Sequence, residues 1–117
     1  MVKIFRPSRY KVPVRKLVAF AQKILESYSG GDLLVNIIFV GKRRMIGIAS
    51  AYKNEFVALP VLSFAFEGTQ ADNYEPPLLG EVYICYPQAV LLAAEKEKSV
   101  DAILEQLIEH GIRNLAG

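Results

Sequence analysis

The segment from Asp32 to Val40 constrains the fold most strongly, because it is almost entirely apolar and reads DLLVNIIFV. Branched aliphatic residues dominate this segment and glycine precedes and follows it, which is typical of a buried strand. Such a strand needs other elements to cover it. The chain has 117 residues, enough for one hydrophobic core and too few for two ordinary domains. We therefore predict a single domain over residues 1–117.

The remaining elements follow from hydrophobic spacing and from the positions of proline and glycine. Apolar residues recur three and four positions apart after Pro13 until Gly30 and Gly31, which predicts an amphipathic helix. The other predicted elements are strands over Val2–Phe5, Val61–Phe66 and Glu81–Tyr86, helices over Gly41–Tyr52, Pro87–Lys98 and Ser99–Leu115, and a polar loop over Glu67–Pro77. This order predicts an α+β (mixed α/β) domain: a four-stranded mixed sheet with about four helices, the last one central.

Membrane and secreted classes do not fit the sequence. The longest uncharged stretches contain about a dozen residues and a proline, well short of the roughly 20 apolar residues of a membrane helix. Pro7, Arg9 and Lys11 interrupt what would be the apolar part of a secretory signal, so we expect a cytoplasmic protein. The single cysteine, Cys85, lies in an apolar run and is expected to be a buried thiol.

The end of the last predicted helix carries the most distinctive polar residues. His110 lies three residues after Leu107, at the border of the apolar stripe, and Asn114 follows it by one turn. Two interpretations of His110 are open at this point: a hydrogen-bonded structural residue, or a metal ligand.

Five short motifs resemble those of one known family. They are NIIFV (Asn36–Val40), the pair Tyr52 and Lys53, VLSF (Val61–Phe64), LGEVYI (Leu79–Ile84) and the pair His110 and Gly111. In the same order and with similar spacing, they are similar to motifs of the YbeY-type rRNA maturation endoribonucleases. The resemblance implies a metal-dependent hydrolase of single-stranded RNA that acts in 16S rRNA maturation. Its chemistry requires three histidines that hold one Zn²⁺ and leave a position open for water.

The sequence departs from this family pattern at its polar positions. His110 matches the first histidine, whereas the second falls on Asn114 and the third would fall three residues beyond Gly117. We therefore expect His110 and Asn114 to form an incomplete metal site, with no cofactor unless other ligands complete a zinc site. Lys53 replaces the family's arginine, which keeps the charge but loses the bidentate fork. Catalysis through His110 is thus expected to be weak or lost.

Charge is distributed unevenly along the chain. Eleven basic and two acidic residues occur up to Lys53, a balance of +9, whereas three basic and ten acidic residues follow, a balance of −7. We predict RNA binding by Lys42, Arg43, Arg44 and Lys53 along one groove, with Tyr10 and Tyr52 as stacking partners for unpaired bases. The alternative is a solvated surface that only maintains solubility.

These observations lead to three functional hypotheses. The first is a YbeY-like protein that binds rRNA or small ribosomal subunit proteins and has an incomplete metal site. The second is an active endoribonuclease whose site is completed by a carboxylate such as Glu81 or Glu109, or by a second chain. The third is a small interaction protein without catalysis.

Overall fold

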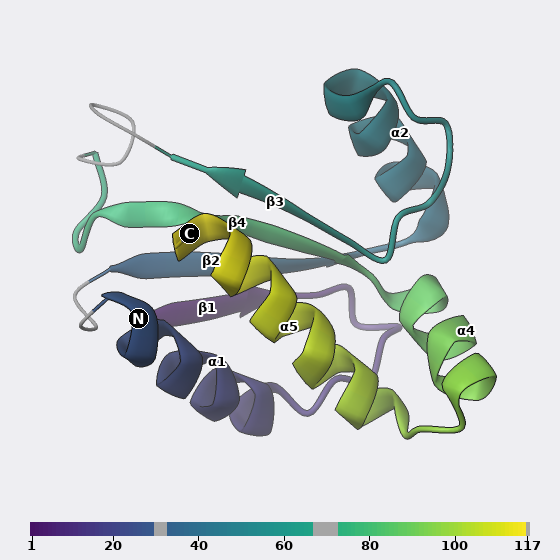
Figure 1. Cartoon of the computed structure of the whole chain (residues 1–117), viewed down its shortest axis with the longest axis horizontal. Helices are drawn as coiled ribbons and strands as arrows, with labels where there is room; N and C mark the ends of the chain where they lie inside the picture. Colours follow the sequence, from purple (N-terminus) through teal and green to yellow (C-terminus); the bar gives the residue numbers. More distant parts are fainter. Residues whose placement is uncertain (30–32, 67–72, 117) are drawn as a thin grey trace.

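The computed structural model describes residues 1–29, 33–66 and 73–116. Its elements, in chain order, are β1 (Val2–Phe5), α1 (Val14–Ser29), β2 (Leu34–Val40), α2 (Lys42–Lys53), β3 (Val61–Ala65), β4 (Leu78–Cys85), α4 (Tyr86–Lys96) and α5 (Val100–Ala116). Figure 1 shows one sheet with helices around it. The predicted α+β fold with a four-stranded mixed sheet is confirmed.

The strands follow the order β1-β2-β4-β3. β1 pairs parallel with β2, and β2 pairs parallel with β4, whereas β3 runs antiparallel to β4 at the edge. The apolar segment that dominates the sequence therefore forms an interior strand. Its alternate residues Ile37 and Phe39 enter the main core, while Asn36 and Ile38 occupy positions of the opposite parity and are half-buried.

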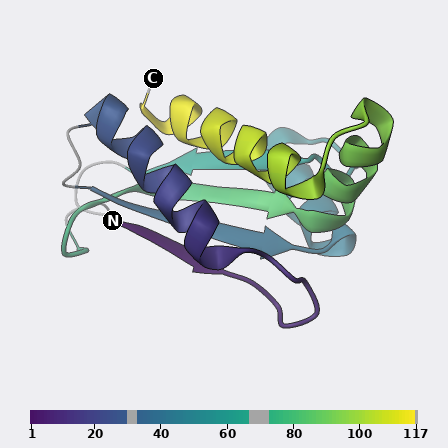
Figure 2. The ribbon, with the colours of Figure 1, turned by 90° about the horizontal axis from the view of Figure 1, so that it is seen from below.

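One face of the sheet is covered by α1 and α5, which lie side by side across it (Figure 2). The apolar stripe of α5 is fully buried at Ile103, Leu104, Ile108 and Ile112. These residues join Leu17 and other side chains of α1, β2 and β4 in the main core. The central position predicted for the last helix, which carries His110, is therefore confirmed.

The other face of the sheet is only partly covered. α2 packs near the ends of β2 and β4, where Met45 belongs to a smaller core with Val40, Leu62 and Cys85. Among the described residues, no other helix lies on this face (Figures 1 and 2). Part of the sheet surface beside α2 is therefore accessible to a ligand.

Some predicted boundaries differ from the structure. β4 begins at Leu78, not at Glu81, because Leu78 and Gly80 already pair with Leu34 and Val35 of β2 across a register shift. The start of the predicted loop, residues 67–72, and Asp32 of the predicted strand lie outside the described residues. Within the described ranges, no helix has the length and apolar character needed to cross a membrane.

Candidate functional site

His110 lies in a small hollow between α5 and β3. The hollow has a volume of about 220 Å³ and is also lined by Lys53, Ser63 and Asn114. Asn114 follows His110 by one helical turn, and its Nδ2 lies 3.2 Å from His110 Nε2. The structure thus brings together three residues that the sequence singled out, Lys53, His110 and Asn114, although they come from two separate helices.

Two of the short motifs meet directly beside this hollow. The Ser63 hydroxyl donates a hydrogen bond of 3.1 Å to the carbonyl oxygen of Gly111, which joins β3 to α5. A Cβ atom on Gly111 would lie 2.5 Å from Val82 Cγ1, so only glycine allows α5 to approach β4 this closely. Ser63 and Gly111 therefore set the position of His110 over the sheet. The sequence motifs contained both residues, but their contact depends on the fold.

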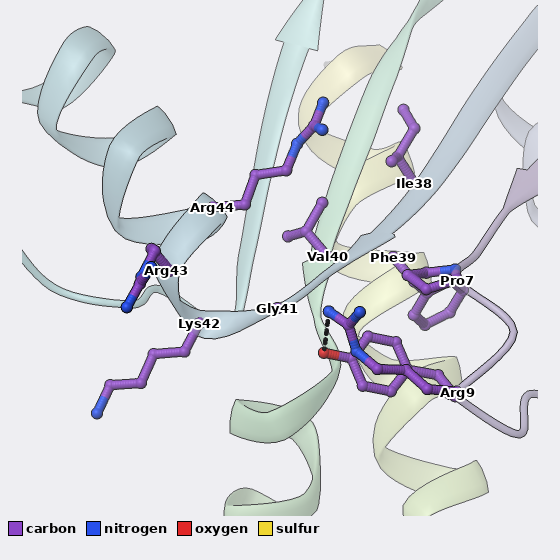
Figure 3. Close-up of a pocket in the computed structure, with 10 residues that line it drawn as sticks. Pro7, Arg9, Ile38, Phe39, Val40, Gly41, Lys42, Arg43 and Arg44 are labelled. Atoms are coloured by element: carbon purple, nitrogen blue, oxygen red, sulfur yellow. Dashed lines mark hydrogen bonds between the residues drawn. The ribbon is translucent and has the colours of Figure 1, made fainter.

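A larger hollow of about 640 Å³ lies at the beginning of α2, and we call it the basic hollow. Its charged lining residues are Arg9, Lys42, Arg43 and Arg44, and the described lining contains no carboxylate. In Figure 3, Arg44 extends from α2 across the sheet beside Val40, whereas Lys42 and Arg43 point away from Arg9. Arg9 and Arg44, from two separate segments, thus flank the opening, while Lys42 and Arg43 line it with side chains that extend outwards.

The four predicted RNA-binding residues do not line one common hollow. Lys42, Arg43 and Arg44 line the basic hollow, and Lys53 lines the hollow of His110. The reason is geometric: Lys42 and Lys53 are the first and last residues of α2, and a helix rises 1.5 Å per residue, which separates them by about 16 Å. The structure therefore distributes these cations over two sites.

Arg9 lines the basic hollow although it is not among the four predicted RNA-binding residues. Its guanidinium carbon lies 4.8 Å from the centroid of the Tyr10 ring, and its Nη2 donates to the Tyr10 hydroxyl at 3.3 Å (Figure 3). The Tyr10 ring also stacks on Tyr86 at 4.7 Å. Because Tyr10 already has these ring contacts, it is poorly placed to stack on a base. Tyr52, by contrast, is 70% exposed.

The residues around His110 do not fit a three-ligand zinc site. Zinc sites use imidazole, thiolate and carboxylate ligands, and an asparagine amide is a poor substitute. In the described part of the chain, no group of three His, Cys, Asp or Glu residues is arranged to hold a metal. Glu81 lines a different hollow from His110, and Glu109 accepts a bond from Arg113 Nη2 at 3.2 Å. Neither carboxylate lines the hollow of His110.

A family model described as endoribonuclease YbeY matches residues 3–117. The chain belongs to the YbeY family. Among curated relatives, the endoribonuclease YbeY of Anaeromyxobacter sp. is 28% identical over 93% of this chain and 55% of its own length. That of Ureaplasma urealyticum is 37% identical over 68% of this chain and 49% of its own length.

The chain spans about half the length of these YbeY relatives. Among solved structures, the solution structure of TM1509 from Thermotoga maritima has a TM-score of 0.68 and 22% sequence identity. The match covers 100% of this chain and 73% of the other. This likeness shows a shared fold. The resemblance suggested by the motifs is confirmed by the family match.

Proposed function

We propose that this member of the YbeY family binds single-stranded rRNA, and that its described residues contribute RNA binding more than hydrolysis. One observation carries the proposal: Arg9, Lys42, Arg43 and Arg44 line a hollow whose described lining has no acidic residue. Phosphates of RNA neutralise such cations and release counterions, which makes binding favourable and dependent on salt.

Lys53 extends this proposal to the hollow of His110. An ammonium group binds phosphate as a point charge, so Lys53 holds a phosphate without fixing its orientation as an arginine fork would. Ser63 and His110 line the same hollow and offer further hydrogen-bonding groups. The arrangement suits a phosphodiester that passes over the edge of the sheet between α2 and α5.

RNA binding is tested by changing the charges at the basic hollow. We expect the double substitution Arg43→Ala with Arg44→Ala to weaken binding of every single-stranded RNA. It should also reduce the slope of log affinity against log salt by about 1.4, the value for two lost phosphate contacts on a single strand. The measurement is fluorescence anisotropy over a range of potassium chloride concentrations. The matched control is Lys96→Ala with Lys98→Ala, which removes two exposed cations that do not line the hollow and should leave the slope unchanged.

An unchanged slope in the Arg43 and Arg44 variant would mean that these charges only maintain solubility. Equal losses in both double variants would show that binding depends on net charge and not on the basic hollow.

The rival function is hydrolysis by a completed metal site, and the proximity of His110, Lys53 and Ser63 favours it. Metal analysis of the purified protein separates the two. We expect no stoichiometric zinc, because one imidazole and one amide bind zinc weakly. One zinc per chain that disappears in His110→Ala, together with zinc-stimulated RNA cleavage lost in the same variant, would overturn our proposal.

A further inference from the structure

A third hollow lies on the accessible face of the sheet, and we call it the aromatic hollow. It has a volume of about 420 Å³ and is lined by Tyr52 of α2, Phe64 of β3 and Tyr83 of β4. Tyr52 and Phe64 have ring centroids 4.6 Å apart, and Phe64 and Tyr83 have centroids 5.7 Å apart, both edge to face. Tyr52 is 70% exposed, so part of its ring surface is free to contact a planar ligand.

The aromatic hollow also contains a hydrogen-bond acceptor. Glu81 lines it, and the Tyr83 hydroxyl donates to Glu81 Oε1 at 3.1 Å. Burial raises the pKa of Tyr83, and the nearby Glu81 carboxylate raises it further. Tyr83 therefore remains a donor that orients the carboxylate. An ionised carboxylate has two oxygens and about four acceptor positions, so Glu81 retains capacity for a ligand that donates two hydrogen bonds.

The aromatic hollow connects the two sites described above. Arg44 lines both the basic hollow and the aromatic hollow. Ala65 lines both the aromatic hollow and the hollow of His110, and Tyr52 precedes Lys53 at the end of α2. A single strand that follows these shared residues places phosphates near Arg44 and Lys53, with a base between them.

We propose that the aromatic hollow binds one unpaired base of RNA and prefers guanine, an inference that rests on the proposed RNA binding. Exposed aromatic rings stack on bases of single-stranded RNA, and carboxylates and other polar groups recognise the Watson–Crick edge. Guanine is the only common base whose edge carries two adjacent donors, N1–H and the N2 amino group. These two donors match the two oxygens of Glu81.

A small organic cation is the other ligand that aromatic rings and a carboxylate would suit. Arg44 argues against it, because a guanidinium in the lining repels a second cation. The same arginine favours a nucleotide, since it attracts the phosphate of the base that the rings hold.

The test uses fluorescein-labelled pentanucleotides, UUGUU, UUAUU and UUUUU, with anisotropy as the readout. We expect the wild-type protein to bind UUGUU about tenfold more tightly than UUUUU, the effect of one good bidentate pair. Glu81→Gln should abolish most of this preference, because its amide offers one acceptor oxygen in place of two, and should bring the affinity for UUGUU close to that for UUUUU. The matched control Glu95→Gln changes an exposed glutamate of α4 that does not line the aromatic hollow, and it should keep the preference.

Stacking is tested separately at Tyr52, whose exposure means that its loss should not unfold the protein. Tyr52→Ala should weaken binding of all three oligonucleotides about fivefold or more, and Tyr52→Phe should restore most of the affinity because the ring is kept. Circular dichroism of each variant checks that the fold is intact.

The outcomes distinguish the two proposals. Equal binding of UUGUU, UUAUU and UUUUU by the wild type, or a guanine preference that survives Glu81→Gln, overturns the base site and leaves RNA binding intact. Absence of binding to all three oligonucleotides, and to longer single strands, overturns both the base site and the proposed function.

Discussion

Substitution of Gly111 by alanine tests most directly how α5 is held on the sheet. Alanine is the better helix former, by about 1 kcal/mol, so helix propensity alone predicts stabilisation. The added Cβ would lie 2.5 Å from Val82 Cγ1 and 3.0 Å from Cγ2. Normal carbon contacts lie at about 3.5 to 4.0 Å, so α5 or β4 must move by about 1 Å. Val82 is fully buried and has little room to move.

Overpacking of this kind costs typically about 1 to 3 kcal/mol, and more when the neighbours are rigid. Because Val82 is fully buried, the upper part of this range applies, about 2 to 3 kcal/mol. After the gain of about 1 kcal/mol in helix propensity, we expect Gly111→Ala to lower the free energy of unfolding by about 1 to 2 kcal/mol. Urea denaturation followed by far-UV circular dichroism measures it. Gly47→Ala is the matched control, because a Cβ there meets no atom within 4 Å and Gly47 is exposed on α2. It should stabilise the protein by about 0.5 to 1 kcal/mol.

A double-mutant cycle identifies the clash itself. Val82→Ala removes both Cγ atoms and should cost about 1 to 3 kcal/mol alone, as a buried truncation. Combined with Gly111→Ala, the total loss should be smaller than the sum of the single losses, because the added methyl group occupies the space left by Val82. The reasoning fails if Gly111→Ala is as stable as Gly47→Ala, or if the two losses simply add.

Two further predictions concern single residues. Cys85 is fully buried, and burial raises the pKa of its thiol, so less thiolate forms at pH 8. Labelling of Cys85 by a disulfide reagent should therefore be at least about tenfold slower in the native protein than in urea. Equal rates would contradict this burial. The Ser99 hydroxyl accepts a hydrogen bond of 3.1 Å from the backbone N–H of Ala102 at the beginning of α5. Ser99→Ala should therefore lower the free energy of unfolding by about 1 kcal/mol in the same urea assay. An unchanged denaturation midpoint would show that this cap does not contribute to stability.

Local patterns predicted most elements because each pattern is set by contacts within a few residues. The proline before α1 and the apolar stripe of α5 are examples. The start of β4 was placed three residues late, because Leu78 and Gly80 become part of a strand only through pairing with β2. Gly80 in particular has no strand preference of its own, and the partner strand decides its conformation.

The candidate sites, like the strands, depend partly on local sequence and partly on contacts made by the fold. Basic residues at the start of α2 were evident from the sequence, yet Arg9 joins them only because the segment after β1 returns beside α2. Glu81 was considered as a ligand for the metal of His110, but it faces the aromatic hollow with Tyr83. Successive residues of a strand point to opposite faces of the sheet. A match to a family motif therefore does not indicate which hollow each side chain of the motif lines.

The sequence by itself therefore determined the elements, the membership in the YbeY family and the presence of His110, Asn114 and Lys53. Hydrophobic periodicity and short motifs carry that information because they are local. Only the tertiary structure decided that Lys53 joins His110 while Arg44 faces the basic and aromatic hollows. The close packing of Gly111 on Val82 positions His110 over the sheet, and the packing of Met45 in one core with Leu62 and Cys85 positions α2. Both depend on contacts between residues far apart in the chain.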